Sequence, residues 1–185
     1  MAQFDDETVV VYQAYRPEIG HFAAKHGYFG GAFSLGRMSW IKPNFLWMMY
    51  RCGWASKDGQ EVVLAVTIER RAFDEILAAA VPSSYGQVDR FASTAEWSNA
   101  VKTSDVRLQW DPDHGPSGAP LERRAIQLGL RGDVLARYAR PWIRSIEDIS
   151  DFVRAQAKLR GSNELVTPSE DVYPVSPETA AILGL

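Results

Sequence analysis

The stretch Thr8–Gly27, TVVVYQAYRPEIGHFAAKHG, predicts a strand that is followed directly by a helix. Residues 8–15 are β-branched and aromatic and are apolar on both faces, a pattern typical of a central strand. Pro17 stands in the first turn of the following helix, where proline is best tolerated, and Gly27 is a helix stop. The chain therefore begins with one strand and one helix in close succession.

Hydrophobic spacing in the rest of the chain predicts helices and strands in irregular alternation. Segments 45–52, 73–80, 93–101, 134–138 and 145–160 have helical features, segments 61–69, 106–111 and 124–130 read as strands, and 82–92 and 112–120 read as loops. The alternation has no regular strand-helix-strand rhythm and several connections are long, which favours an α+β fold over a doubly wound parallel sheet. We expect one mixed, mostly antiparallel sheet flanked by helices.

Length and composition divide the chain into a body and a tail. At 185 residues the chain fits one domain, which we place at residues 1–160. From Gly161 onward prolines and polar residues dominate, so residues 161–185 are predicted to form a loosely structured tail.

Charge and cysteine content restrict the class of protein. A net charge of −3 lacks the basic footprint of general nucleic-acid binding, although a local arginine cluster could still hold RNA or DNA. Cys52 is the one cysteine, so no intrachain disulfide can form and a reducing compartment is expected. The acidic N-terminal stretch is unlike a signal peptide, and no apolar run is long enough to span a bilayer. We therefore expect a cytoplasmic protein without a membrane partner.

The usual signatures of metal and phosphate sites are missing. His21 and His26 are five residues apart on a predicted helix and fall on different faces, so no metal site is expected. Neither the dinucleotide-binding nor the P-loop glycine spacing occurs, and there is no nucleophile elbow. Cys52 lies on an apolar helix face, where it is expected to act as a small hydrophobic residue.

Residues 37–51, RMSWIKPNFLWMMYR, place three cations close to a large aromatic surface. A helix N-terminus with nearby cations suits an anion such as phosphate, and Trp or Tyr rings can stack a base. Alternatively, the helix is simply buried and its cations reach water. The polar and aromatic residues of interest are Arg37, Ser39, Trp40, Lys42 and Asn44 before the helix and Trp47, Tyr50 and Arg51 on it.

Two further polar groups stand at strand ends. Gln13, Tyr15 and Arg16 close the first strand, and the buried Gln13 amide needs either hydrogen-bond partners or a cavity. Arg107, Gln109 and Asp111 share one face of the strand at 106–111. That face is either solvated or part of a site.

Several blocks resemble a widespread family described as a domain of unknown function, number 4291 of that series. They are VVVYQAYRPEIGHFA, FSLGRMSWIKPNFLWMMYRCGWA, VRLQWDP and RAIQLGL with WIRSIEDI, and they run from about Thr8 to about Val153. The tryptophan-rich block is very specific. This resemblance implies no established activity.

More remotely, the chain resembles the ADP-ribosyltransferase superfamily. Those folds begin with a strand that ends in a polar residue that binds NAD, and a helix that ends in glycine follows. Gln13 and Gly27 stand at these two positions here. The second motif of the superfamily would fall near Ser39 and Trp40 and the third near Gln109. Gln13 stands where the superfamily usually has His or Arg.

The remote resemblance implies an NAD-using transferase of the ADP-ribosyl type. Arg37 and Lys42 would hold the pyrophosphate, Trp40 or Tyr15 would stack the nicotinamide, and Gln109 or Asp111 would orient the ribose or the acceptor. The implied catalytic residues are Gln13, Gln109 and Asp111, and the implied NAD-binding residues are Tyr15, Arg16, Arg37, Ser39, Trp40, Lys42 and Asn44. Two alternatives stay open: a nucleotide- or RNA-binding module without catalysis, and a non-catalytic interaction protein whose tail docks on a partner or on its own domain.

Overall fold

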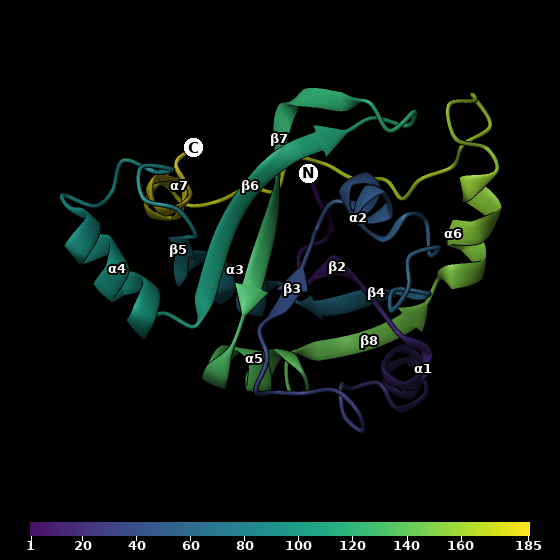
Figure 1. Cartoon of the computed structure of the whole chain (residues 1–185), viewed down its shortest axis with the longest axis horizontal. Coiled ribbons are helices and arrows are strands. Elements are labelled where there is room, and N and C mark those ends of the chain that lie inside the picture. The colour runs from purple at the N-terminus through teal and green to yellow at the C-terminus, as the bar shows by residue number, and fades with distance from the viewer.

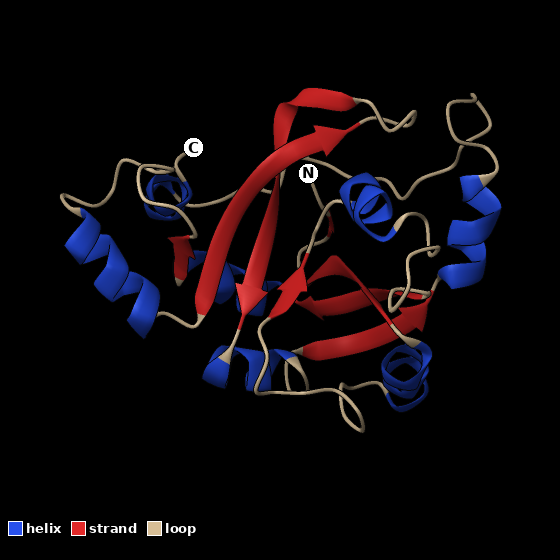
Figure 2. Ribbon diagram, in the orientation of Figure 1, coloured by secondary structure: helices blue, strands red, loops and turns tan.

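Two four-stranded sheets form the framework of the computed structural model, which describes residues 1–185 (Figures 1 and 2). The first sheet has the order β1-β2-β4-β8, with every neighbouring pair antiparallel. The second has the order β3-β7-β6-β5, in which only the β5–β6 pair is parallel. The strands are β1 Gln3–Phe4, β2 Thr8–Tyr15, β3 Ser39–Ile41, β4 Val62–Glu69, β5 Ala80–Pro82, β6 Val106–His114, β7 Pro120–Leu130 and β8 Ile143–Asp148.

Seven helices surround the sheets, so the expected α+β class is confirmed. In Figure 1 the long β6–β7 hairpin runs across the direction of β4 and β8, with α4 at one side of the molecule and α6 at the other. None of the helices combines the length and apolar character that a bilayer crossing requires. The helices are α1 Pro17–His26, α2 Phe45–Cys52, α3 Arg70–Ala78, α4 Thr94–Thr103, α5 Gly132–Tyr138, α6 Ser150–Ala157 and α7 Pro177–Leu183.

The main hydrophobic core lies between the two sheets. Val11 and Leu64 of the first sheet and Leu108 and Leu128 of the second belong to one buried cluster. The opposite face of β2 is also buried, because Tyr12 packs in a second cluster with α2 and α6. Both faces of β2 are therefore covered, as its doubly apolar sequence predicts.

The two sheets meet at a pair of backbone hydrogen bonds. The Tyr12 N–H donates to the Lys42 carbonyl oxygen over 2.7 Å, and the Lys42 N–H donates to the Tyr12 carbonyl oxygen over 3.2 Å. Lys42 follows β3 directly, so these bonds attach the edge of the second sheet to the central strand of the first. The backbone of Lys42 is therefore held by both sheets.

Three sequence-based assignments were wrong because tertiary pairing overrode local pattern. The loop expected over 112–120 is shorter, since residues 112–114 belong to β6 and Pro120 begins β7. The helix expected over 73–80 ends at Ala78, and Ala80 belongs to β5, which pairs with Val106. The segment 145–148, expected as the start of a helix, belongs to β8, where Ile146 pairs with Val66. Local helix propensity is a weak preference that tertiary context overrides, and here pairing with β4 satisfies the backbone of this segment and buries Ile146.

Residues 161–185 run back along the body of the chain. Ala2 and Asp171 exchange two backbone hydrogen bonds of 2.9 Å, and the Tyr173 hydroxyl donates to Asp74 over 2.7 Å. Leu183 of α7 is buried, and its carbonyl oxygen accepts from the Trp110 ring N–H over 2.9 Å. The division into a body of residues 1–160 and a loosely attached tail stays a prediction.

Candidate functional site

Eight of the ten predicted site residues line one cleft of about 730 Å³, here called the Lys42 cleft. The cleft is walled by β2, β3, α2 and the β6–β7 hairpin, so it lies where the two sheets join. Its volume is in the range of small-molecule sites. The predicted residues that line it are Gln13, Tyr15, Arg37, Ser39, Trp40, Lys42, Gln109 and Asp111.

Lys42 is a largely buried cation whose ammonium group has no protein acceptor. The residue is 5% exposed, and its ammonium group forms no ion pair and no hydrogen bond with any protein acceptor. Its Nζ lies 5.0 Å from the centroid of the Trp47 ring. Burial, together with the Arg51 charge, lowers the pKa of Lys42 to about 8, and the Asp111 carboxylate opposes that change.

Two glutamines hold the carboxylate of Asp111 at the opposite wall. The side-chain amide of Gln109 donates to Asp111 Oδ1 over 2.9 Å, and that of Gln127 donates to Oδ2 over 2.7 Å. Gln109 and Gln127 are directly paired across β6 and β7, so the sheet register places both amides on one side. Each carboxylate oxygen thus has an amide donor, and Asp111 does not pair with Lys42.

Gln13 is the centre of a buried hydrogen-bond network beside the cleft. Its amide nitrogen lies within hydrogen-bond distance of three acceptors that share its two N–H groups: the Tyr15 hydroxyl at 2.8 Å, Ser39 Oγ at 2.9 Å and the Trp40 carbonyl oxygen at 3.1 Å. Its amide oxygen accepts from the Tyr138 hydroxyl over 2.6 Å. Since its amide is fully engaged, Gln13 can position Tyr15 and Ser39 more readily than it can bind a ligand.

Replacing Tyr138 with phenylalanine should destabilise the fold by about 1–3 kcal/mol, because it leaves the buried Gln13 amide oxygen without a donor. Urea unfolding of the variant and the parent chain measures this difference. Tyr50→Phe is the matched control, since the Tyr50 side chain is exposed and its hydroxyl has no protein partner. Equal losses in both variants would show that the network adds nothing to stability.

Aromatic and cationic side chains complete the cleft wall. Trp40, Trp47 and Met48 supply apolar surface, and the exposed Arg37 and Arg51 supply positive charge at the rim. Burial raises the pKa of the Tyr15 hydroxyl well above its ordinary value, so this group acts as a neutral hydrogen-bonding partner. The wall thus combines ring surface with three cations and one shielded carboxylate.

Arg16 and Asn44 lie outside this cleft. Arg16 is exposed, pairs with Glu18 at 3.5 Å and lines an adjoining cavity of about 400 Å³. Asn44 caps α2: its side-chain oxygen accepts from the Trp47 N–H over 2.7 Å, and its amide donates to Glu170 over 2.8 Å. The Asn44 side chain is therefore used by the protein itself.

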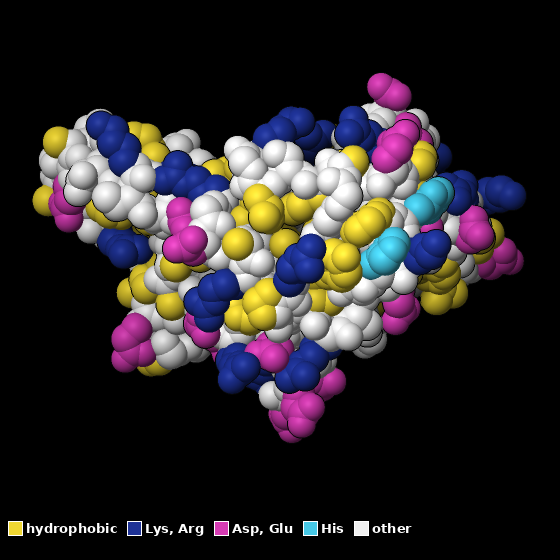
Figure 3. Space-filling view, turned by 90° about the horizontal axis from the view of Figure 1, so that it is seen from below, with side chains coloured by type: hydrophobic (Ala, Val, Ile, Leu, Met, Phe, Trp, Pro, Cys, Tyr) yellow, Lys and Arg dark blue, Asp and Glu magenta, His cyan; other side chains and the backbone are white.

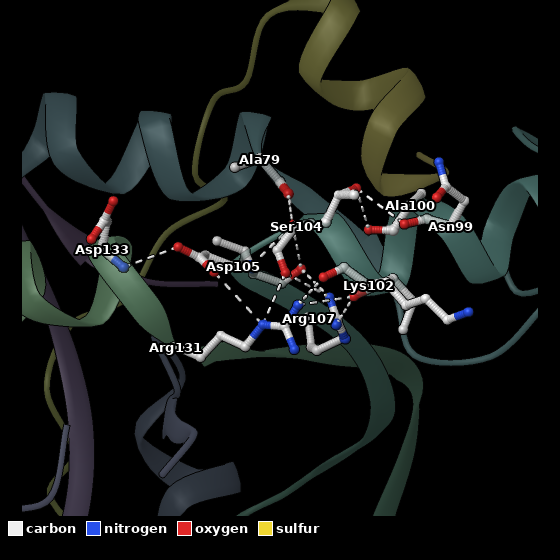
Figure 4. Close-up of polar contacts among 12 residues, drawn as sticks. Ala79, Asn99, Ala100, Lys102, Ser104, Asp105, Arg107, Arg131 and Asp133 are labelled. Atoms are coloured by element: carbon white, nitrogen blue, oxygen red, sulfur yellow. Dashed lines mark hydrogen bonds and ion pairs between the residues drawn. The ribbon is translucent and has the colours of Figure 1, made fainter. Parts of the chain in front are cut away.

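The Arg107 side chain does not reach the Lys42 cleft, although Arg107, Gln109 and Asp111 occupy every second position of β6. Its guanidinium group donates to the carbonyl oxygen of Ser104, at the C-terminal end of α4 (Figure 4). It also donates to the carbonyl oxygen of Val101 in the last turn of that helix. Arg131 donates to the same two carbonyl oxygens and also to that of Lys102. The expectation of a simply solvated face is therefore wrong for Arg107, which is buried because it closes the end of a helix.

Sequence reasoning missed two glutamines of the cleft. Gln127 lies in the middle of the apolar segment RAIQLGL, and a polar residue in a buried strand was a usable signal. Gln60 reaches the cleft from the loop before β4, and no local pattern distinguishes it.

Neither the charged surface nor the two histidines of α1 indicates a second site. On the face shown in Figure 3, Lys and Arg side chains are interspersed with Asp and Glu. His21 lies 3.7 Å from Asp148, whereas the His26 ring stacks on Phe22 with centroids 4.1 Å apart. No group of three or more His, Cys, Asp or Glu side chains is arranged to hold a metal ion.

Comparison with known proteins gives a family and no activity. The model of the family described as Domain of unknown function (DUF4291) matches residues 1–174. The match confirms the first of the two resemblances and extends it to both sides of the blocks that carried it. No curated protein matches the chain.

Proposed function

The chain belongs to the DUF4291 family, and we propose that the Lys42 cleft of this member binds a nucleotide, with NAD as the first candidate. The observation that carries the proposal is the ammonium group of Lys42, which belongs to a largely buried side chain, opens on the cleft and has no protein acceptor. Buried charges in proteins are normally paired, because an isolated ion loses its hydration without compensation. An anionic ligand in the cleft would supply the missing partner.

The lining of the cleft favours a nucleotide over a simple anion. Arg37 and Lys42 would hold a pyrophosphate, with Arg51 adding charge at the rim. Trp40 and Tyr15 offer ring surface on which a planar base or nicotinamide could stack. A cleft of about 730 Å³ has room for both parts of such a ligand.

We further propose, on the remote resemblance, that the bound NAD is used for ADP-ribosyl transfer. In that reaction the bond between the ribose C1 and nicotinamide breaks, nicotinamide leaves with the bonding electron pair, and an acceptor attacks C1 and loses a proton. The Asp111 carboxylate, held by Gln109 and Gln127, would stabilise the positive charge that develops on the sugar. Gln13 would act through Tyr15 and Ser39 as a positioning residue.

Millimolar NAD should raise the thermal midpoint of the intact chain, since a ligand that binds only the folded state stabilises it. At a concentration ten times Kd the expected gain is about 1.4 kcal/mol, or roughly 3–6 °C for a chain of this size. Arg37→Ala should lose most of that shift, whereas Arg160→Ala, an exposed residue outside the cleft, should keep it.

Comparing several ligands distinguishes nucleotide binding from the transfer reaction. ADP-ribose should also shift the midpoint, whereas nicotinamide alone should not, because it carries no phosphate. Nicotinamide released from NAD, followed by proton NMR with water as the acceptor, tests the transfer reaction. The absence of a shift with every phosphorylated ligand would refute the nucleotide proposal, and a shift without nicotinamide release would leave a binding module.

A further inference from the structure

The amine of Lys42 is held in a setting that suits a nucleophile as well as an ion-pair partner. Its backbone is attached to β2 by two hydrogen bonds, so the side chain starts from a rigid position. The charged and titratable groups around it are Arg51 and Cys52 from α2 and Asp111 from β6, with Arg37 on the same cleft wall. Two amide donors occupy the Asp111 carboxylate, so no carboxylate forms an ion pair with the amine.

These surroundings favour the neutral amine. Desolvation and a neighbouring guanidinium group both disfavour the ammonium form, and the pKa of Lys42 falls to about 8. At pH 7.5 about a quarter of the Lys42 side chains would then be neutral, against well below 1% for an exposed lysine. Desolvation next to another cation is a known way for proteins to activate a lysine toward carbonyl compounds.

We propose that Lys42 is a covalent binding site for phosphorylated aldehydes, such as the open-chain form of a sugar phosphate. The lone pair of Nζ adds to the carbonyl carbon, a proton moves from nitrogen to the carbonyl oxygen, and loss of water leaves an imine. No oxidant or reductant takes part. Arg37 and Arg51, which also line the cleft, hold the phosphate group while the amine reacts.

This site shares the cleft of the proposed function but does not depend on NAD. The nucleotide proposal uses the ammonium form of Lys42 as a charge, whereas imine formation uses the neutral form as a nucleophile. One residue can do both in turn because about equal amounts of the two forms exist near pH 8.

Labelling with pyridoxal 5′-phosphate followed by borohydride reduction tests the inference. The reagent is a phosphorylated aldehyde, and reduction turns each imine into a stable amine that peptide mass spectrometry locates. The chain contains four further lysines, Lys25, Lys57, Lys102 and Lys158, all exposed, which serve as internal controls in the same digest. Lys42 should be labelled about tenfold to a hundredfold faster than these four at pH 7.5.

Three comparisons decide the outcome. The rate at Lys42 should rise with pH to a midpoint near 8. Pyridoxal without the phosphate should lose the preference for Lys42, and so should Arg37→Ala with the complete reagent. Equal labelling of all five lysines overturns the inference, and equal preference with pyridoxal overturns the selection for phosphate.

The result is independent of the nucleotide proposal because pyridoxal 5′-phosphate contains no nucleoside. A chain that shows no thermal shift with NAD but labels preferentially at Lys42 would keep this inference and lose the other. A chain that binds NAD but is labelled equally at all lysines would keep the nucleotide proposal and lose the covalent site at Lys42.

Discussion

Lys42→Met should make the folded chain more stable and at the same time remove most of its affinity for an anionic ligand. The wild-type Lys42 side chain is largely buried and its ammonium group has no protein acceptor, so the fold carries a desolvation cost that the contact with the Trp47 ring offsets only in part. Methionine has a similar length and no charge, and it tolerates irregular apolar surroundings. The lowering of the Lys42 pKa from 10.5 to about 8 corresponds to a gain of about 3 kcal/mol at pH 7 in the variant.

The pH dependence of this gain has a definite sign. Lys42 has a lower pKa in the folded chain than in the unfolded chain, so between pH 8 and 10.5 the unfolded chain binds more protons. The wild-type chain therefore gains stability as the pH rises through this window. The advantage of Lys42→Met is largest below pH 8 and disappears above about 10.5.

Ligand affinity should change in the opposite direction to stability. A hydrogen bond to a charged group contributes about 1.5–3 kcal/mol, so the loss of Lys42 should weaken nucleotide binding about tenfold to a hundredfold. Affinity of the wild-type chain should also fall as the pH rises above 8, because a bound anion favours the protonated form. Such opposed effects are typical of residues kept for function at the expense of stability.

Urea unfolding at several pH values and titration with ADP-ribose measure the two effects. Lys25→Met is the control: Lys25 is exposed in the last turn of α1, and its replacement should change stability by no more than about 0.5 kcal/mol. A loss of stability in Lys42→Met would show that the ammonium group is satisfied within the fold, and the argument for an anionic ligand would then fail.

The sequence predicted the elements well where local and tertiary preferences agree. The strand Thr8–Tyr15 was predicted to the residue, and Gly27, expected as a helix stop, ends α1 with positive φ. Prediction failed at β8, because only the pairing with β4 makes residues 145–148 a strand. The two-sheet arrangement was not expected either, since nothing local reveals that Tyr12 and Lys42 pair.

The residues of the Lys42 cleft were predictable from the sequence only where they are neighbours along the chain. Lys42 and Trp40 were identified because cations and rings adjacent in sequence stay adjacent in any fold. Gln127 was not, because its part in the cleft follows from its register opposite Gln109, which is a long-range property. Asn44 fits the same local pattern as Lys42 but serves as the cap of α2, and only the three-dimensional structure separates the two roles.

Glu170→Ala should destabilise the chain by about 2–4 kcal/mol, although Glu170 lies in the segment predicted to be a loose tail. Its carboxylate accepts from the Phe45 N–H over 2.6 Å and from the Asn44 side-chain amide over 2.8 Å. Removing it leaves two donors without partners at the start of α2, each worth about 1–3 kcal/mol, and removes a negative charge from the positive end of the helix.

Glu170→Gln should cost far less. The glutamine oxygen can still accept from the Phe45 N–H, but its NH₂ group meets the Asn44 amide, which cannot turn because its oxygen accepts from Trp47. The substitution also has a stabilising effect, because it removes a carboxylate whose charge is disfavoured in the folded chain. Burial raises the pKa of Glu170 to about 6, which reflects that cost. The two effects are each about 2 kcal/mol and nearly cancel.

The pH dependence separates the two variants further. The pKa of Glu170 is higher in the folded chain, about 6, than its ordinary value of 4.5, so the folded chain binds more protons between these values. The wild-type chain therefore gains stability from this group as the pH falls from 7 to 4.5. The deficit of Glu170→Ala should consequently be larger at pH 5 than at pH 7.

Thermal and urea unfolding of both variants, with Glu164→Ala as an exposed control from the same segment, measure these differences. Ligand affinity should fall in Glu170→Ala as well, because Trp47, Met48 and Arg51 of α2 line the Lys42 cleft. A Glu170→Ala chain as stable as Glu164→Ala would show that the Glu170 carboxylate does not hold the start of α2.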